Sequence, residues 1–278
     1  MEKISLSKKA QQILNRGNKW KHQIDIKKTS YNLNFDLVKI PNIGKAKENK
    51  VEAIWQEKFK DAKNMGNILF PGPIMSMKSV SKEKKKINLK LFKTNYKYVI
   101  AAREINLSPQ YDYFIGIRGI CQVRVDNQTC IVIGARSPKT TSMKGELEAI
   151  PAGILMPDDF KKQKPLKTRL ISEFKEELSI EEKIKIENMD LISIKGCKDV
   201  VSIDIRFLFK VENDWLNHFE VNKHKNFHKI ISLKGSFPEH RAVYIVPLTS
   251  LSDFIVSHKD SWAISKDILL DLYEYLKR

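Results

Sequence analysis

The chain of 278 residues is long enough for one large domain, or for one domain of ordinary size with a smaller one beside it. It is 42% hydrophobic and 30% charged, and no apolar run reaches the roughly 18 to 20 residues that span a bilayer, so we expect no membrane segment. The Lys-rich start lacks the apolar core of a signal peptide, which predicts a cytoplasmic location.

Cysteine usage and net charge narrow the classes of partner. The three cysteines, Cys121, Cys130 and Cys197, are far apart and form no CxxC pair, which argues against a disulfide framework and a zinc knuckle. Fifty Lys and Arg against 33 Asp and Glu give a net charge of +17, which favours anionic partners such as nucleotides, nucleic acid or acidic lipid. The charge alone does not choose among them, because Lys-rich runs are also common in solvated loops.

The first third of the chain predicts a small mixed α/β module, residues 1–109. A short amphipathic helix is expected at 8–14, a strand at 32–40, a turn at 64–73, and β-type residues at 87–92 and 96–101. A second helix at 51–62 carries a stripe at helical spacing that we expect in the core: Ile54, Trp55, Phe59 and Ala62. The boundary is expected near 107–109.

The remainder, residues 110–278, predicts a mixed α/β sandwich. Strands at 113–125 and 129–133 are expected to form a hairpin across Asp126, Asn127 and Gln128, because Asp and Asn tolerate turn geometry. Pro165 suits the start of a helix. Further strands are expected at 190–194, 200–211 and 241–246, helical or irregular structure at 215–228, and a closing helix at 261–278.

The helix after Pro165 carries an acidic face. Glu173, Glu176 and Glu177 are spaced i, i+3 and i+4, so they converge on one side of a helix, beside an apolar stripe that can bury it. Three carboxylates repel one another unless a cation lies between them, and their oxygen atoms suit Mg²⁺ or Mn²⁺. The alternative is an exposed acidic face without a ligand.

Gly153 followed by Glu173-Phe-Lys-Glu-Glu-Leu-Ser-Ile180 resembles the Nudix box, GX5EX7REUXEEXGU. Ile150-Pro-Ala-Gly153 is similar to the LPAG that opens the box in Nudix enzymes acting on nucleoside diphosphates joined to sugars. The resemblance implies a Nudix-type α/β/α sandwich, with Gly153 and the three glutamates binding metal and the glutamates serving catalysis.

This chain departs from the Nudix pattern at several positions. Ser172 replaces the Arg, Ser179 replaces the Gly, and the loop after Gly153 is about five residues longer than the pattern allows. Asp158 or Asp159 are candidates for the first pattern glutamate. Because Arg169 lies four residues before Glu173, we expect its guanidinium to brace the acidic cluster in place of the missing Arg.

Weaker similarities indicate further site residues and a branch of the family. Residues 51–55, 70–73 and 91–97 resemble the N-terminal region of UDP-sugar diphosphatases, in the ADP-ribose pyrophosphatase-like branch. The family often adds a glutamate from a late loop, and Glu239 stands in that region; the alternative is a solvated loop residue. Arg118 and Arg136 on the early strands are candidates for binding phosphates, unless they are structural.

The sequence leaves two functions open. The first is a Mg²⁺-dependent pyrophosphohydrolase that cleaves a nucleotide sugar or a related nucleoside diphosphate derivative. The second is a catalytically weak Nudix-fold protein that binds a nucleotide or RNA, which the changes at Ser172 and Ser179 favour. By resemblance, such a chain forms a homodimer.

Overall fold

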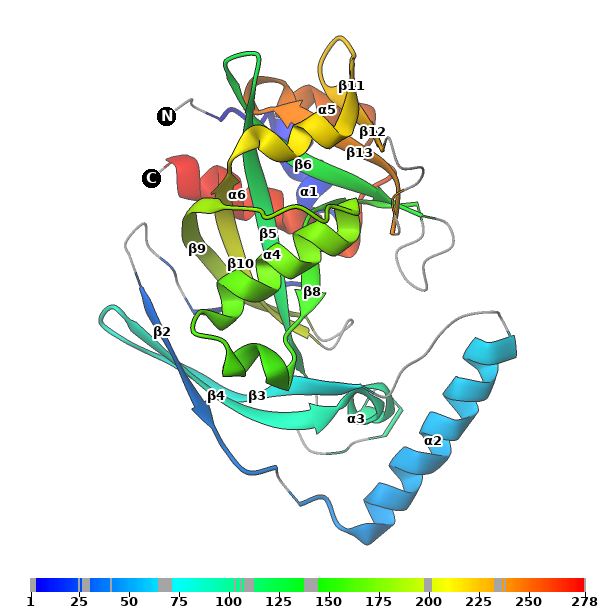
Figure 1. Cartoon of the computed structure of the whole chain (residues 1–278). Coiled ribbons are helices and arrows are strands. Elements are labelled where there is room, and N and C mark those ends of the chain that lie inside the picture. The colour runs from blue at the N-terminus through cyan, green and yellow to red at the C-terminus, as the bar shows by residue number, and fades with distance from the viewer. Residues whose placement is uncertain are drawn as a thin grey trace.

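The computed structural model describes residues 4–24, 26, 31–40, 42–64, 72–102, 104–105, 107, 113–137, 145–197, 202–232, 237 and 239–277. Within these ranges, thirteen strands join in one mixed sheet, and helices cover both of its faces (Figure 1). The predicted mixed α/β class is therefore confirmed. No helix in the described ranges is long and apolar enough to cross a membrane.

The centre of the sheet is built by four long strands. Strand β5 (Phe114–Val125) and strand β6 (Gln128–Arg136) form the predicted hairpin, with Asp126 and Asn127 at φ of 49° and 61° in the turn. Strand β10 (Ser202–Val211) runs parallel to β5 and antiparallel to β9 (Ile186–Cys197). The long alternating pattern of these segments explains why they pair over most of their length.

Shorter strands complete the sheet around that centre. Strand β1 (Lys21–Ile24) pairs with β9 at one end of the strand order. At the other end, β6 is followed by β13 (His240–Pro247), β12 (His228–Ser232) and β11 (Phe219–Lys223). Strands β7 (Leu147–Ala149) and β8 (Ala152–Ile154) pair with β6 and β5 and bring the segment containing Gly153 onto the sheet.

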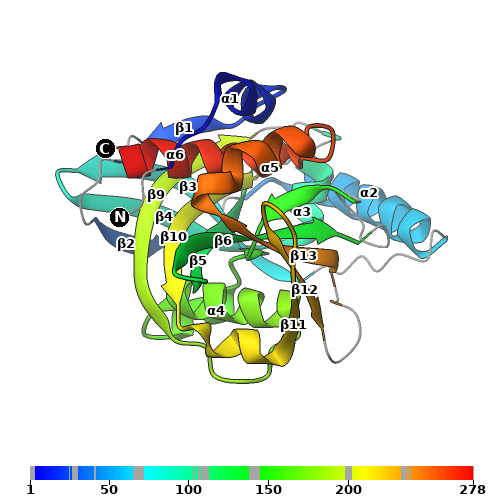
Figure 2. The same cartoon turned by 90° about the horizontal axis from the view of Figure 1, so that it is seen from above.

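Two separate hydrophobic cores lie on the two faces of the sheet. Helix α4 (Pro165–Leu178) buries Leu166, Leu170 and Phe174 against one face. Helices α1 (Lys8–Asn15), α5 (Leu251–Ser257) and α6 (Ile268–Lys277) pack on the opposite face, against residues such as Ile131 and Leu208. Figure 2 shows these three helices on one side of the strands and α4 on the other. The α/β/α sandwich is therefore confirmed.

The first third of the chain contacts the sandwich at several points. Strands β2 (Asn32–Leu37), β4 (Lys86–Asn95) and β3 (Pro73–Glu83) pair in that order, and Ser76 of β3 pairs with Phe114 of β5. Strand β1 is part of the sheet, and helix α1 is part of the helical layer on the face opposite α4. The division into residues 1–109 and 110–278 stays a prediction, and the expected boundary falls mostly outside the described residues.

Four local predictions differ from the structure. Residues 96–101 form helix α3 (Tyr96–Ala102) rather than a strand, because the Asn95 carboxamide accepts a hydrogen bond from the Lys97 N–H and caps the helix. The 215–228 segment contains the 3-10 helix Asn213–His218 and the start of the β11/β12 hairpin. The closing helix expected at 261–278 begins only at Ile268, after the 3-10 helix Ile264–Asp267. In addition, helix α5 was not anticipated.

The fourth difference concerns helix α2 (Lys45–Asn64), which extends away from the rest of the molecule (Figure 1). Trp55 is buried as expected, but Phe59 is 41% exposed, so the helix packs on a narrower stripe than its spacing suggested. Most of the expected turn at 64–73 lies outside the described residues. The three cysteines are buried, and none of them forms a disulfide in this structure.

Candidate active site

Helix α4 begins and ends where its sequence indicates. Pro165 occupies the first turn, where a missing N–H is tolerated. The helix ends at Ser179, which adopts the left-handed conformation with φ of 54° and ψ of 43°. This is the backbone position that the Nudix pattern gives to glycine, and glycine alone adopts it without steric penalty. Ser179 thus follows the glycine conformation at some cost in stability.

Gly153 on β8 lies directly against the Glu173 carboxyl group. A Cβ atom added at Gly153 would lie 1.9 Å from Glu173 Oε1 and 2.1 Å from its Cδ. Any larger residue would therefore displace the carboxylate. The structure brings together these two site residues, which are separated by twenty positions in the chain.

Glu177 is buried one helical turn further along α4. Its Oε1 accepts a hydrogen bond of 2.8 Å from the Ala152 N–H on β8. Its Oε2 is also buried and has no hydrogen-bond donor among the described residues. Burial raises the pKa of Glu177 well above its ordinary value, and the nearby charge of Glu148 raises it further.

Glu176 has a different environment from the other two glutamates. It is exposed and faces an open depression of about 740 Å³ at the end of α4, and the Ser172 hydroxyl donates a 2.7 Å hydrogen bond to it. The serine in place of the pattern Arg therefore contacts the acidic cluster after all. In the described part of the chain, no three His, Cys, Asp or Glu side chains come close enough together to hold a metal ion.

Arg169 forms the i,i+4 ion pair with Glu173 that the spacing predicted, although its contribution to activity stays a prediction. The pKa of Glu173 is raised to about 7, mainly by burial. The charges of Glu176 and Glu239 contribute to this rise, and Arg169 opposes it. The guanidinium of Arg169 therefore offsets only part of the negative charge of the acidic cluster.

Glu148, on β7, is the main residue of the site that the sequence did not single out. It is 2% exposed and accepts a 2.6 Å hydrogen bond from Arg136 Nη1, with Arg118 Nη1 at 3.5 Å and His240 Nε2 at 3.7 Å. Burial alone would raise the pKa of Glu148, but His240 and the two guanidinium groups hold it at about 2. Its position inside an apolar segment, between Leu147 and Ala149, was the available signal.

The two candidate phosphate-binding arginines are tied to acidic partners. Arg118 donates from Nε to Asp204 Oδ2 at 2.5 Å, in addition to its contact with Glu148. Arg136 Nη2 lies 3.5 Å from Glu239 Oε2. Their side chains are only 15% and 14% exposed, which suits the structural alternative, while phosphate binding stays a prediction.

Glu239 and the two loop aspartates have more open surroundings. The Glu239 side chain is 49% exposed and reaches the cluster through Arg136. Asp158 forms an exposed ion pair of 2.8 Å with Lys161. Asp159 accepts a 2.8 Å hydrogen bond from the Met156 N–H and so caps the 3-10 helix Pro157–Lys161. Asp159 therefore has a local structural role.

The donor chemistry of the cluster suits a hard divalent cation. Its donors are carboxylate oxygens, the buried Oε2 of Glu177 has no hydrogen-bond partner among the described residues, and the raised pKa values of Glu173 and Glu177 show that their negative charge is not fully compensated. A cation would have to draw the carboxylates closer together than they lie in this structure. A cation there would supply the positive charge that Arg169 supplies only to Glu173. Glu173, Glu176, Glu177 and the segment at Gly153 are the residues that would hold it.

Comparisons with known proteins give only distant likenesses. The sequence matches no protein-family model and no curated protein. The NUDIX domain of Shewanella oneidensis NrtR, solved with ADP ribose, covers 64% of this chain and 96% of its own length, at 13% identity and a TM-score of 0.35. The M. smegmatis Nudix hydrolase RenU covers 59% and 87%, at 9% identity and a TM-score of 0.32.

A third similar structure is a MutT/nudix family protein from Enterococcus faecalis. It covers 63% of this chain and 74% of its own length, at 10% identity and a TM-score of 0.26. Such low scores and identities establish neither a shared fold nor a shared activity.

Proposed function

We propose that this protein is a Nudix-type pyrophosphohydrolase, dependent on Mg²⁺ or Mn²⁺, that cleaves a nucleoside diphosphate linked to another group. UDP-sugars and ADP-ribose are the substrate types that we favour, with a nucleoside monophosphate and a phosphorylated moiety as products. The observation that carries the proposal is the contact between Gly153 and Glu173, with Glu177 held by the neighbouring Ala152 N–H. These are residues of the box-like motif, and they meet in three dimensions.

The cation would neutralise charge that develops on the diphosphate and orient the attacking water. The remaining roles belong to side chains of this chain. Arg169 holds Glu173 in place through its ion pair. Arg136 pairs with the buried Glu148 and with the half-exposed Glu239. We assign it the role of binding the diphosphate, because a guanidinium makes forked contacts with phosphate oxygens. Glu239 is assigned to accept a proton from water.

The proposal is tested by incubating the protein with Mg²⁺ and a panel of UDP-glucose, ADP-ribose, NADH, dinucleoside polyphosphates and capped RNA. We expect phosphate-containing products from at least one nucleotide sugar. Glu176→Gln should reduce turnover by about 10² to 10⁴ fold, because it removes a carboxylate proposed to hold the cation. The side chain is exposed, so the change should leave folding intact. Glu220→Gln, an exposed change on β11, is the matched control and should leave turnover unchanged.

Cation binding has a readout that is independent of turnover. Added Mg²⁺ or Mn²⁺ should raise the thermal unfolding midpoint of the wild type and of Glu220→Gln, because a ligand that binds only the folded state stabilises it. The rise should be lost in Glu177→Gln. Equal rises in all three proteins would place the cation elsewhere.

One observation favours a second candidate, a nucleotide-binding protein with little turnover. Arg169 already pairs with Glu173, and no three acidic groups converge among the described residues. Tight binding of a nucleotide without products, unchanged by Glu176→Gln, would support this alternative and contradict the hydrolase.

A further inference from the structure

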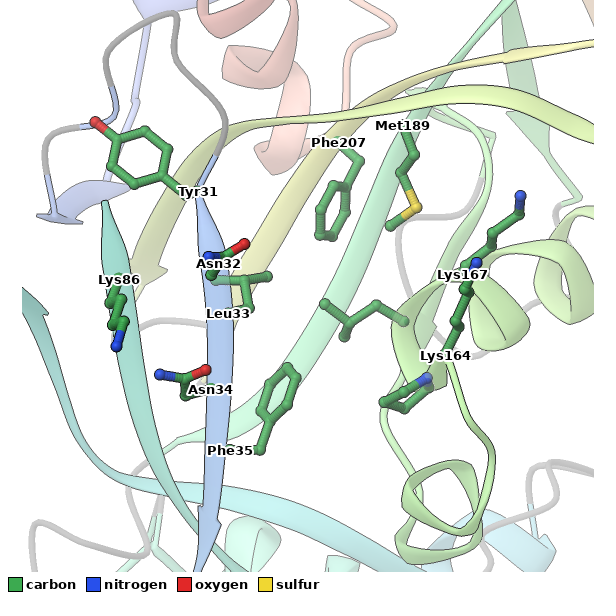
Figure 3. Close-up of a pocket in the computed structure, with 12 residues that line it drawn as sticks. Tyr31, Asn32, Leu33, Asn34, Phe35, Lys86, Lys164, Lys167, Met189 and Phe207 are labelled. Carbon is green, nitrogen blue, oxygen red and sulfur yellow. The ribbon is translucent and has the colours of Figure 1, made fainter. Parts of the chain in front are cut away.

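A second pocket lies at the N-terminal end of α4, whereas Glu173, Glu176 and Glu177 lie in the second half of the helix. It has a volume of about 550 Å³ and opens between strand β2 and the first turn of the helix (Figure 3). Its lining includes none of the candidate active-site residues. At about 1.5 Å per residue, its contact at Leu166 lies about 10 Å along the helix axis from Glu173 and about 15 Å from Glu176. The pocket is therefore separate from the proposed site of hydrolysis.

The floor and one wall of the pocket are apolar and partly aromatic. Phe207 of β10 and Met189 of β9 form the floor, and Phe35 of β2 forms the facing wall. Phe207 is only 3% exposed, so its position is fixed by the core. Phe35 is held by an edge-to-face contact with Phe160, with ring centroids 5.2 Å apart. Such surfaces accept a flat ring.

The rim of the pocket is basic. Lys86 on β4 lies on one side, and Lys164 and Lys167 at the start of α4 lie on the other (Figure 3). The Lys167 ammonium also donates a 3.0 Å hydrogen bond to the Ile186 carbonyl, which fixes its stem. Among the described residues that line the pocket, none is Asp or Glu. Three cations without an acidic neighbour in the lining favour an anionic ligand.

We propose that this pocket binds a nucleotide, with the base against the aromatic wall and the phosphate near Lys164 and Lys167, while Lys86 adds positive charge from the opposite rim. Inorganic phosphate would not cover the apolar floor, and an uncharged apolar ligand would gain nothing from the positive potential of the lysines. A planar ring joined to a phosphate satisfies both parts of the lining. The volume is within the roughly 300 to 1,000 Å³ range of small-molecule sites.

The same chemistry is presented by a free nucleotide and by the terminal nucleotide of a single-stranded RNA. Both sources use the lysines and the aromatic wall in the same way. Binding at this pocket should not require turnover. The test therefore uses Glu176→Gln as the parent protein, so that hydrolysis does not consume the ligand.

Binding is measured by calorimetric titration of the full chain with ADP, UMP, inorganic pyrophosphate and a ten-nucleotide single-stranded RNA. Lys164→Glu and Lys86→Glu should each weaken nucleotide binding about tenfold or more, which is about 1.4 kcal/mol. Lys162→Glu is the matched control, with the same change of net charge two residues from Lys164 and outside the lining. We expect it to change Kd less than twofold.

Phe35→Ala tests the aromatic wall, and it should weaken ADP binding while leaving pyrophosphate binding unchanged. Pyrophosphate that binds as tightly as ADP would overturn the assignment of the base. Equal losses for Lys164→Glu and Lys162→Glu, or no loss for either, would overturn the site. If Lys164→Glu weakens the binding of ADP and UMP, the ligand is a free nucleotide. If the wild-type pocket binds only the RNA, and Lys164→Glu weakens that binding, the ligand is the end of an RNA strand.

Discussion

Two regions of the molecule bury charged side chains, and they compensate those charges differently. On the face of the sheet that α6 covers, Lys195 on β9 and Arg206 on β10 form ion pairs with two aspartates. Asp267 lies just before α6 and Asp271 in its first turn, and the N to O distances are 2.7 to 2.9 Å. Two cations thus face two carboxylates. Burial would raise the pKa of Asp271, but Arg206 and Lys195 lower it below its ordinary value.

The acidic cluster on α4 lacks this balance. Glu173 and Glu177 are both buried, and the pKa of each is raised by burial and by neighbouring carboxylates. The contrast separates a structural ion network from a candidate site. Where each buried charge has a partner, the network joins α6 to the sheet. Where acids remain in excess, they are relieved either by taking up protons, as their raised pKa values indicate, or by a cation.

Arg206→Met is expected to have the largest effect, because it leaves two buried carboxylates with Lys195 alone. We expect a loss of about 3 to 5 kcal/mol in the free energy of unfolding, measured with urea. Lys210→Met, on the same strand, breaks an exposed pair with Glu187 and should cost at most about 1 kcal/mol. Similar losses in both variants would contradict a special role for the buried network.

The acidic cluster should make stability fall between pH 5 and pH 8. Glu173 has a pKa of about 7 in the folded protein and 4.5 ordinarily, so the folded state holds the extra proton in that range. The destabilisation grows as pH rises and reaches about 3 kcal/mol above pH 7. Glu173→Gln should flatten the dependence, and Glu220→Gln should not. An unchanged slope in Glu173→Gln would show that the charge is compensated.

Gly153→Ala tests the close approach on which the candidate site depends. The added methyl group would overlap the Glu173 carboxyl group, so we expect a loss of about 1 to 3 kcal/mol in stability. The same substitution in a Glu173→Ala background should cost much less, because the obstructing group is gone. A double-mutant cycle measures this coupling, and additive effects would mean that the two residues do not meet.

Arg169→Ala should lower the rate of hydrolysis about tenfold or more, since the ion pair that holds Glu173 is lost. Lys167→Ala is the control on the same helix, and its side chain contacts the Ile186 carbonyl rather than the acidic cluster. Equal small effects on kcat/KM would remove the bracing role of Arg169.

Ser179→Gly is expected to have the smallest effect, and in the stabilising direction. Ser179 holds a positive φ of 54°, so glycine should relieve strain and raise the unfolding free energy by up to about 1 kcal/mol. Ser172→Gly, at a helical position without positive φ, should instead destabilise the protein. Destabilisation by Ser179→Gly would show that the serine side chain outweighs the strain.

Local sequence spacing determined much of the fold and part of the site. The 126–127 turn, the start of α4 at Pro165 and the contact between Arg169 and Glu173 depend on residues within one turn or one helix. A fixed periodicity suffices for such features. The cap at Asn95 was missed because β-type residues follow it, although one side-chain hydrogen bond starts a helix there.

Only the tertiary structure decided which charges meet across the sheet. Arg118 and Asp204 are 86 residues apart, and Glu148 meets Arg136 and His240 from three different strands. Strand order and register set these contacts, and no local pattern encodes them. The sequence by itself determined that three glutamates share a helix. The packing of β7 and β8 decided that two of them are buried without full compensation, because that burial removes the water that would otherwise screen their charge.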